Sequence, residues 1–415
     1  MPGRIEAMTE PFPSRISYAE ALAIATRVAA SRRLPAEQVV LSRAHGRVLA
    51  RDVVATRFLP PFDNAAMDGF ALRHADLPAS GEAVLRLYGE QFAGGTPVPG
   101  PGPGGCVRIT TGAPMPPGTD TVVIRENTME EDGSVRILQL PRAGQNVRMK
   151  GEDVRPGDPL LAAGEVLTPA RIALAAAQGL AALEVVRRPT VAVVTTGDEL
   201  VEPGLPLGEG QLYDSNRGLL MGLLHADGLD PVALPSLPDD PGRIGSALRQ
   251  AGEAFDVVLT CGGVSAGEKD HLQALLRLHG QVHFWKVRMK PGMPVLFAGG
   301  GGFGPALFLC LPGNPVSALA TYVALARPLL DAMQGRAARR RWRARLDAPW
   351  HKRHERLEFL RGILRSGDDG TLRVEPNPAD GSHRLRAAAD ADVLIVLGEG
   401  AGTYPAGSVV DVLPV

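Results

Sequence analysis

The sequence has few cysteines, few aromatic residues and almost no net charge. Its cysteines, Cys106, Cys261 and Cys310, form no C-x-x-C pair, which argues against a structural zinc site and predicts buried thiols in a reducing compartment. Aromatic residues make up only 5%, so the cores should be aliphatic. The formal net charge of −1 gives no overall attraction to nucleic acid or an anionic membrane, and we expect neither as a partner.

Long apolar segments are also scarce. Residues 1–16 contain no apolar run typical of a signal peptide. The most apolar long stretch, Ile172 to Val186, contains Gln178 and Glu184 and is too short to cross a bilayer. We therefore expect a soluble, cytoplasmic protein. The one basic run, Arg336 to Arg345, favours a solvated linker, with binding of RNA or anionic lipid as the alternative.

Glycine (49) and proline (36) are abundant instead, which indicates many short strands and turns. Strands alternate with helices from Thr190 onward, a pattern typical of a mainly parallel, doubly wound sheet. The segments on either side have short apolar runs broken by turn residues. We expect a multidomain α/β plus β protein: an N-terminal helical and mixed domain from residues 14–50 and 146–188, an inserted β-rich domain from 51–145, a central doubly wound α/β domain from 189–333, and a small C-terminal β-barrel from 346–415.

Capping residues predict where several helices begin. Ser17 opens a capping box with Glu20, and Thr168 precedes a proline at the first position of a predicted helix. Asp214 and Asn314 are the expected caps of two later helices. The apolar run from residue 232 to residue 237 predicts a strand.

Two glycine-bearing loops follow predicted strands of the α/β segment. In Thr196-Gly197-Asp198-Glu199, a carboxylate at the end of a strand can bind Mg²⁺ or orient water, and the alternative is a turn in which Asp198 caps. In the segment 262–267, glycine N–H groups and the Ser265 hydroxyl can hold an anion. Asp270 then follows and could complete a metal site, the alternative being a tight turn.

Basic residues alternate after the second loop. Lys286, Arg288 and Lys290 should point to one face of a strand, which favours binding of phosphate or another oxyanion over a solvated edge. Earlier in the chain, Asp63-Asn64 and Asp68-Gly69 flank Met67, and an Asx turn alone would explain them.

Taken together, these motifs resemble the molybdopterin molybdenumtransferase family, which includes the C-terminal domain of gephyrin. The resemblance covers nearly the whole chain in matching order. It is carried by Asp63-Asn64 through Asp68-Gly69-Phe70, Thr111-Gly112-Ala113-Pro114, Gly151-Glu152-Asp153, Thr196-Gly197-Asp198-Glu199-Leu200, Tyr213-Asp214-Ser215-Asn216, Gly262-Gly263-Val264-Ser265, Lys290-Pro291-Gly292 and Leu311-Pro312-Gly313-Asn314-Pro315.

The resemblance implies an elongated homodimer whose enzyme activity inserts molybdate into adenylylated molybdopterin, with Mg²⁺-dependent release of AMP. The upstream adenylyltransferase and molybdoenzyme acceptors are implied as partners. Met293 stands where the family usually has a second lysine, and Phe70 where it has tyrosine. The implied roles are catalytic for Asp68, Asp153, Glu199 and Asp270; metal-binding for Glu199, Asp239 and Asp270; and substrate-binding for Thr111, Gly262, Gly263, Ser265, Lys286, Lys290, Pro312 and Asn314.

Two other functions remain open from the sequence. One is the adenylyltransferase that makes the adenylylated pterin, whose single domain resembles residues 190–330. The extra domains on both sides argue against it. The other is a binding scaffold without catalysis, against which the retained acidic residues argue.

Overall fold

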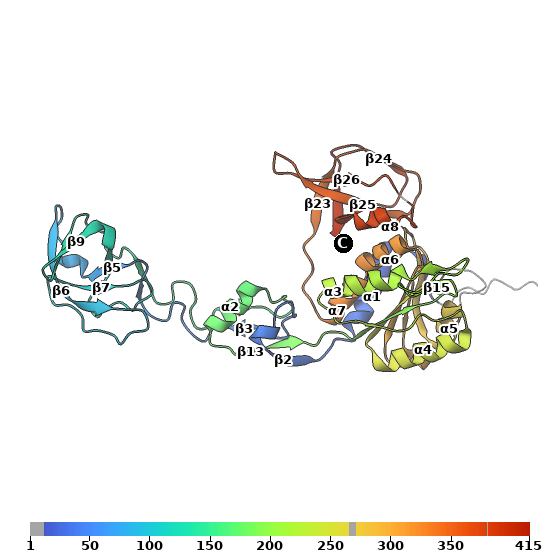
Figure 1. Ribbon diagram of the computed structural model, residues 1–415, viewed down its shortest axis with the longest axis horizontal. Helices are drawn as coiled ribbons and strands as arrows, with labels where there is room; N and C mark the ends of the chain where they lie inside the picture. Colours follow the sequence, from blue (N-terminus) through green and yellow to red (C-terminus); the bar gives the residue numbers. More distant parts are fainter. Residues whose placement is uncertain (1–11, 265–270, 380) are drawn as a thin grey trace, which may run out of the picture.

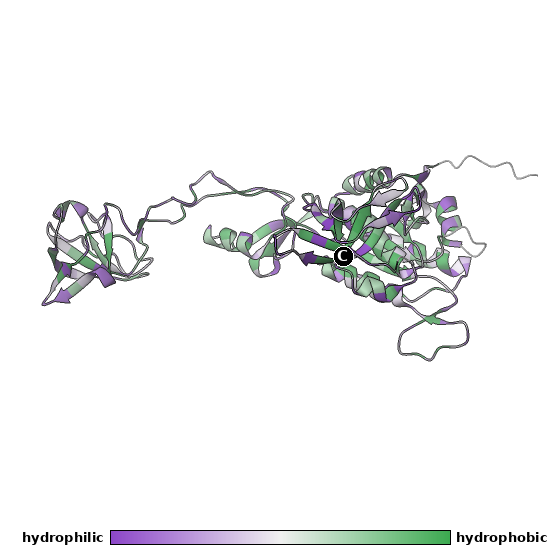
Figure 2. Cartoon of the chain, turned by 90° about the horizontal axis from the view of Figure 1, so that it is seen from above, coloured by the Kyte–Doolittle hydropathy of each residue, from purple (hydrophilic) through white to green (hydrophobic). Residues whose placement is uncertain are grey.

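The computed structural model describes residues 12–264, 271–379 and 381–415 of the chain. The molecule is elongated (Figure 1): a β-rich unit lies at one end, short strand pairs with helix α2 (Pro169–Ala177) form the middle, and an α/β sheet with the C-terminal barrel above it forms the other end. Figure 2 shows the same order from above, with apolar residues prominent in the strands of the sheets. The expected class, α/β plus β in several units, is confirmed. The division into four domains at the stated residues stays a prediction.

The central sheet has the strand order β1-β19-β21-β22-β18-β14-β17. β22, β18, β14 and β17 run parallel, whereas β21 is antiparallel to both of its neighbours, so the sheet is mixed. β14, β18 and β22 are buried along their whole length, as continuous apolar strands covered on both faces should be. The strands span Ser14–Ile16 (β1), Gln281–Val287 (β19), Leu296–Gly299 (β21), Leu307–Leu311 (β22), Val257–Cys261 (β18), Val191–Thr195 (β14) and Val232–Ala233 (β17).

Helices cover both faces of this sheet, which confirms the doubly wound arrangement. One core cluster joins the sheet to α1, α3, α6 and α7, and a second joins its other face to α4 and α5. α1 precedes the β-rich unit in the chain but packs here, against α7. The helices span Tyr18–Ala30 (α1), Ser215–Ala226 (α3), Pro241–Ala254 (α4), His271–His279 (α5), Pro315–Thr321 (α6) and Arg327–Met333 (α7).

Three of the four helix caps that the sequence predicts are made by side chains in the structure. Ser17, Thr168 and Asp214 each accept a hydrogen bond from a backbone N–H in the first turn of α1, α2 and α3. Asn314 also stands at the cap position of α6, but its side chain makes no capping hydrogen bond. Its Nδ2 instead donates to Ser382 Oγ in the C-terminal unit, at 3.3 Å.

The strand expected from residue 232 to residue 237 is shorter in the structure. β17 ends at Ala233, and Leu237 makes only an isolated bridge to Thr196. Pro235 lies between them and has no N–H group to donate to the sheet, which explains the early end of the strand.

The stretch Pro315–Met333, in which a π-helical turn (Tyr322–Ala326) joins α6 to α7, is long and apolar enough to cross a membrane. In the structure, 83% of its most apolar window is buried inside the protein. We therefore regard it as a core helix of the α/β unit.

The β-rich unit is a sheet with strand order β8-β5-β7-β6-β10-β9. Short antiparallel pairs connect it to the rest: β4 with β11 at its base, β3 with β12, and β2 with β13. The strands and the helix beside them span Thr121–Ile124 (β8), Gly69–Leu72 (β5), Gly105–Ile109 (β7), Ala83–Gln91 (β6), Ser134–Ile137 (β10), Thr128–Glu131 (β9), Asn64–Ala65 (β4), Val147–Arg148 (β11), Val53–Val54 (β3), Pro159–Leu161 (β12), Ala36–Val40 (β2), Ala182–Val186 (β13) and Pro169–Ala177 (α2).

The C-terminal unit closes into a barrel because β27 pairs with both β29 and β25. β20, which follows the central strand β19, pairs with β25 and so joins the barrel to the α/β unit. The elements span Met289–Lys290 (β20), Trp342–Leu346 (β23), Trp350–Lys352 (β24), Leu357–Ser366 (β25), Leu372–Pro376 (β26), Leu385–Ala389 (α8), Val393–Leu397 (β27), Gly402–Tyr404 (β28) and Val409–Pro414 (β29).

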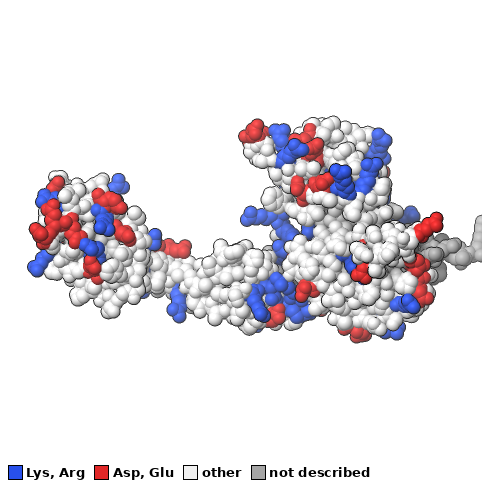
Figure 3. All heavy atoms as spheres, viewed as in Figure 1, with Lys and Arg blue, Asp and Glu red and all other residues white. Residues whose placement is uncertain are grey.

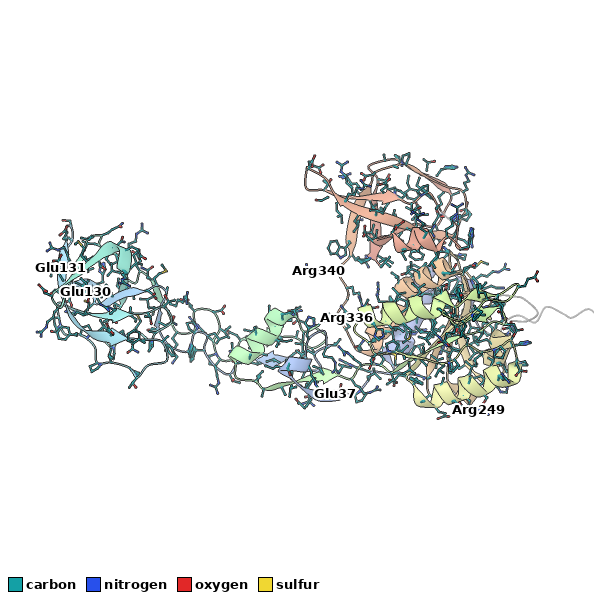
Figure 4. The ribbon with its side chains drawn as sticks, viewed as in Figure 1. Glu37, Glu130, Glu131, Arg249, Arg336 and Arg340 are labelled. Carbon is teal, nitrogen blue, oxygen red and sulfur yellow. The ribbon has the colours of Figure 1, made fainter. Side chains whose placement is uncertain are left out.

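The arginine-rich segment connects α7 to the barrel, and Figure 4 labels Arg336 and Arg340 along it. It is not uniformly solvated, however. Arg339 forms ion pairs with both Asp331 and Asp227, so its first half is held against the α/β unit.

Candidate active site

A pocket of about 570 Å³ lies where β14 and β18 end and where the chain turns from β22 into α6. This is the edge at which open α/β sheets bind ligands. The lining combines both glycine loops, the start of α3 and one residue of the C-terminal unit: Thr196, Gly197, Glu199, Leu200, Leu212, Tyr213, Ser215, Asn216, Asp239, Cys261, Gly262, Gly263, Val264, Pro294, Pro312, Gly313, Asn314, Pro315 and His383. The predicted residues Glu199, Asp239, Gly262, Gly263, Pro312 and Asn314 are thus brought together.

The loop after β18 passes directly against the end of β14. Gly262 has φ +100°, and a Cβ there would lie 2.6 Å from the carbonyl oxygen of Thr196. Only glycine fits this position. The close approach buries Thr196 Oγ1, which has no hydrogen-bond partner among the described residues. Burial raises the pKa of the neighbouring Cys261 thiol, which donates to the Pro312 carbonyl and is not a nucleophile.

The start of α3 supplies a second unsatisfied group. Asp214 caps the helix and also accepts from Thr195 Oγ1 at 2.6 Å, which fixes the turn. Asn216 then donates from Nδ2 to the Gly313 carbonyl at 2.6 Å, while its Oδ1 is buried without a partner in the described part of the chain. A buried polar atom without a partner is costly, so Thr196 and Asn216 offer the pocket a hydroxyl and an amide oxygen for a ligand.

The two adjacent acids of the first loop have different roles. Glu199 lines the pocket and folds over Gly197, whose added Cβ would lie 2.5 Å from Glu199 Oε2. Asp198 instead accepts the backbone N–H of Asp239 at 3.0 Å and orders the opposite wall. Glu199 and Asp239 therefore remain as oxygen donors of the kind that Mg²⁺ prefers.

Two of the predicted residues, Ser265 and Asp270, lie outside the described residues. Within the described ranges, no group of three or more histidine, cysteine, aspartate or glutamate side chains could hold a metal ion. A Mg²⁺ site that uses Asp270 stays a prediction.

The expectation that Lys286, Arg288 and Lys290 share one face is wrong. Lys286 lies within β19 but has φ +62°, which breaks the regular alternation of side chains there, and Lys290 belongs to β20, which pairs with the barrel. Lys286 Nζ lies 3.7 Å from the centroid of the Trp285 ring, beside the glycine loop, since Trp285 Nε1 donates to Val264 O. Arg288 and Lys290 form ion pairs with acids of the C-terminal unit.

Asp68, Thr111 and Asp153 lie away from the pocket. Asp68 accepts hydrogen bonds from the N–H and the hydroxyl of Thr111, at 2.7 and 2.8 Å, and these lower the pKa of the Asp68 carboxyl. Both residues are in the β-rich unit, at the opposite end of the molecule from the α/β sheet (Figure 1). Asp153 follows the short pair at the base of this unit. One copy of the chain therefore does not bring all of the predicted residues together.

Three contributors to the pocket were not predicted from the sequence. Thr196 and Asn216 belong to motifs noted above, and their polar side chains at turn positions were the available signal. His383, with its neighbour Ser382, comes from the barrel. No periodicity or spacing in the sequence indicates that this segment would reach Asn314.

Comparisons with known proteins agree along the whole chain. Three family profiles match: the MoeA N-terminal region (domain I and II) at residues 16–179, a probable molybdopterin binding domain at residues 192–332, and the MoeA C-terminal region (domain IV) at residues 343–415. Molybdopterin molybdenumtransferase of Haemophilus influenzae is 40% identical over 389 residues, covering 91% of this chain and 93% of that protein. Molybdopterin molybdenumtransferase 2 of Mycobacterium tuberculosis is 37% identical, with 89% and 93% covered.

A solved structure is similar over the same extent. The molybdopterin biosynthesis moeA protein of Pyrococcus horikoshii OT3 superposes with a TM-score of 0.80 at 27% identity, covering 96% of this chain and all of that chain. Agreement of this length excludes a single-domain adenylyltransferase. The chain therefore belongs to the MoeA family of molybdopterin molybdenumtransferases, enzymes of molybdenum cofactor biosynthesis.

Proposed function

We propose that this transferase inserts molybdate into adenylylated molybdopterin and releases AMP with the help of Mg²⁺. The observation that carries the proposal is the pocket, where Glu199 and Asp239 stand beside a glycine loop and two unsatisfied polar atoms. A phosphoanhydride needs these elements: N–H donors for its phosphates, and oxygen ligands for a cation.

Each group of the pocket has a separate task in this proposal. The glycine loop holds the nucleotide phosphates, and Thr196 and Asn216 orient the substrate. Glu199 and Asp239 would hold Mg²⁺, which when bound supplies a Lewis acid that polarises a phosphoryl oxygen. Lys286 is a further cation for an oxyanion. Glu199→Gln should keep the fold and lose molybdate-dependent AMP release, because the variant loses a carboxylate charge. A near-normal rate of AMP release would contradict the assignment.

The active site is, in this proposal, shared between two subunits of a homodimer. Asp68 and Thr111 are hydrogen-bonded to each other, yet they belong to the β-rich unit, at the opposite end of the molecule from their own pocket. A two-fold axis lets the β-rich unit of each subunit meet the pocket of the other, which creates two equivalent sites.

Mixed dimers test the shared site. Dimers with Asp68→Ala in one subunit and Glu199→Gln in the other contain one intact site, so they should have about half of the wild-type rate of AMP release. The matched control places both substitutions in one subunit and pairs it with a wild-type subunit. Each of its sites then has one lesion, and it should be inactive. If the control has half activity and the first dimer has none, each site is built within one chain.

A further inference from the structure

One short segment of the C-terminal barrel reaches the pocket, and its residue His383 is part of the pocket lining. The segment leads into α8, which lies beside α6 (Figure 1). Two hydrogen bonds attach it to the start of α6. Asn314 Nδ2 donates to Ser382 Oγ, and the Val316 N–H donates to the Ser382 carbonyl, both at 3.3 Å. The backbone next to His383 is therefore fixed at the edge of the pocket.

The His383 side chain is exposed, although its backbone is ordered. The His383 carbonyl accepts the N–H of Leu385 at 3.0 Å, and the Gly381 carbonyl accepts the N–H of Arg384 at 3.2 Å. A Cβ added to Gly381 would lie 2.9 Å from Cε1 of the His383 ring, so the glycine leaves room for the imidazole. Within residues 12–264, 271–379 and 381–415, the ring has no hydrogen-bond partner. Its nitrogens are available to a ligand.

The side chains around the pocket provide little positive charge. Glu199 and Asp239 line it, and its described lining residues include no lysine or arginine. Within that set, His383 is the one side chain that can become positively charged. Its imidazole offers one N–H donor when neutral and two when charged. Phosphate oxygens accept hydrogen bonds strongly, so a phosphorylated substrate would use such a donor in either state.

The contacts of the turn before α6 place His383 on the same side of the pocket as the glycine loop. The barrel segment is bonded to Asn314 of this turn, and the preceding Gly313 accepts a hydrogen bond from Asn216 Nδ2. A Cβ on Gly313 would lie 3.8 Å from Gly262 Cα. The turn to which the barrel segment is bonded therefore contacts the loop that, in the proposed function, holds the nucleotide phosphates.

We propose that His383 donates a hydrogen bond to a phosphate oxygen of the bound nucleotide. The inference rests on the proposed function and adds a contact from a second structural unit to it. The glycine loop then supplies backbone donors, and the imidazole supplies a side-chain donor. Because this donor belongs to the barrel, the α/β unit alone lacks it.

Binding of AMP and of adenosine to the full-length protein tests this contact. The two ligands differ only in the phosphate, so loss of a phosphate contact affects AMP alone. Calorimetric titrations in the presence of Mg²⁺ give both dissociation constants. In His383→Ala, the dissociation constant for AMP should rise about 10-fold, the lower end for a hydrogen bond to a charged group, because the ring is exposed. The constant for adenosine should stay at its wild-type value.

Two further variants separate the donor from the fold. His383→Gln keeps an N–H donor and should recover part of the affinity for AMP. His351→Ala is the matched control, because His351 is an exposed histidine of the same barrel that does not line the pocket. Its ring lies 2.9 Å from Thr403 Oγ1, and its loss should leave both constants unchanged.

Three results would overturn the proposal: a wild-type affinity for AMP in His383→Ala, an equal loss of affinity for AMP and adenosine in that variant, or an equal loss for AMP in His351→Ala. If the wild-type protein does not bind AMP, the proposed function fails and the inference fails with it. The wild-type titration therefore distinguishes a failure of the proposed function from a failure of the His383 contact alone.

Discussion

Replacing Gly262 by alanine should damage the pocket, whereas the same change at Gly313 should be tolerated structurally. Both glycines line the pocket. The backbone of Gly262 has φ +100°, which costs a residue with a Cβ about 1–3 kcal/mol. The new Cβ would also lie 2.6 Å from a carbonyl oxygen and 2.9 Å from the hydroxyl of Thr196, and overpacking of this kind costs about 1–3 kcal/mol more.

The control position lacks both penalties. A Cβ on Gly313 would have Gly262 Cα, at 3.8 Å, as its nearest neighbour, and its φ is not positive. At about 2–4 °C per kcal/mol for a unit of 150–250 residues, Gly262→Ala should lower the melting temperature of the α/β unit by roughly 4–24 °C. Differential scanning calorimetry of the two variants measures this. If Gly262→Ala melts within about 1 °C of the wild type, the loop can relax away from Thr196 and the steric reasoning fails.

Two further predictions concern the frame around the pocket. On α4, Gly252→Ala should be strongly destabilising, because its Cβ would collide with the carbonyl oxygen of Phe303. Gly245→Ala on the same helix makes only ordinary contacts and should stabilise the protein by about 1 kcal/mol. Similar melting temperatures for the two variants would contradict this. Burial raises the pKa of the Asp256 carboxyl, but hydrogen bonds from Arg187 and from a threonine outweigh burial and leave its pKa below the usual value. Its stabilisation is therefore complete above the unfolded pKa of about 3.9 and is lost as the pH falls through the folded pKa. Asp256→Asn should lower the free energy of unfolding by about 1.5–3 kcal/mol at pH 7, as measured by denaturant melts. The difference from the wild type should shrink below about pH 4. A difference that does not depend on pH would refute the ion pair between Asp256 and Arg187.

The sequence predicted those parts of the molecule that local chemistry determines. The side-chain oxygens of Ser17, Thr168 and Asp214 accept hydrogen bonds from the next turn of the chain, so the helix starts that they mark could be predicted from the local sequence. The glycine loop was predictable for the same reason: a turn between a buried strand and a helix restricts the residues that fit. The pocket at the strand ends followed from the alternation of strands and helices.

The contacts between segments far apart in the chain could not be predicted from the sequence in the same way. The alternation of Lys286, Arg288 and Lys290 predicted one face, but β20 leaves the central sheet to pair with β25 of the barrel. That pairing depends on a partner about seventy residues later in the chain. Asn314 was expected to cap α6, yet Ser382 competes for its side chain from the barrel. Local sequence patterns do not indicate such alternative hydrogen-bond partners, because these partners come close only after distant segments of the chain have packed together.

The short pair at the base of the β-rich unit has a mechanical consequence. Ala65 pairs with Val147, so the chain enters and leaves this unit at the same place. The unit is therefore attached through one two-stranded connection, and bending of this connection would rotate the whole unit as a rigid body. Acidic side chains such as Glu130 and Glu131 are carried on it (Figures 3 and 4). Asp68 and Thr111 would move together with the β-rich unit, because both of their mutual hydrogen bonds lie within it. A change in the orientation of the β-rich unit would displace both residues by the same rotation and leave the geometry between them unchanged.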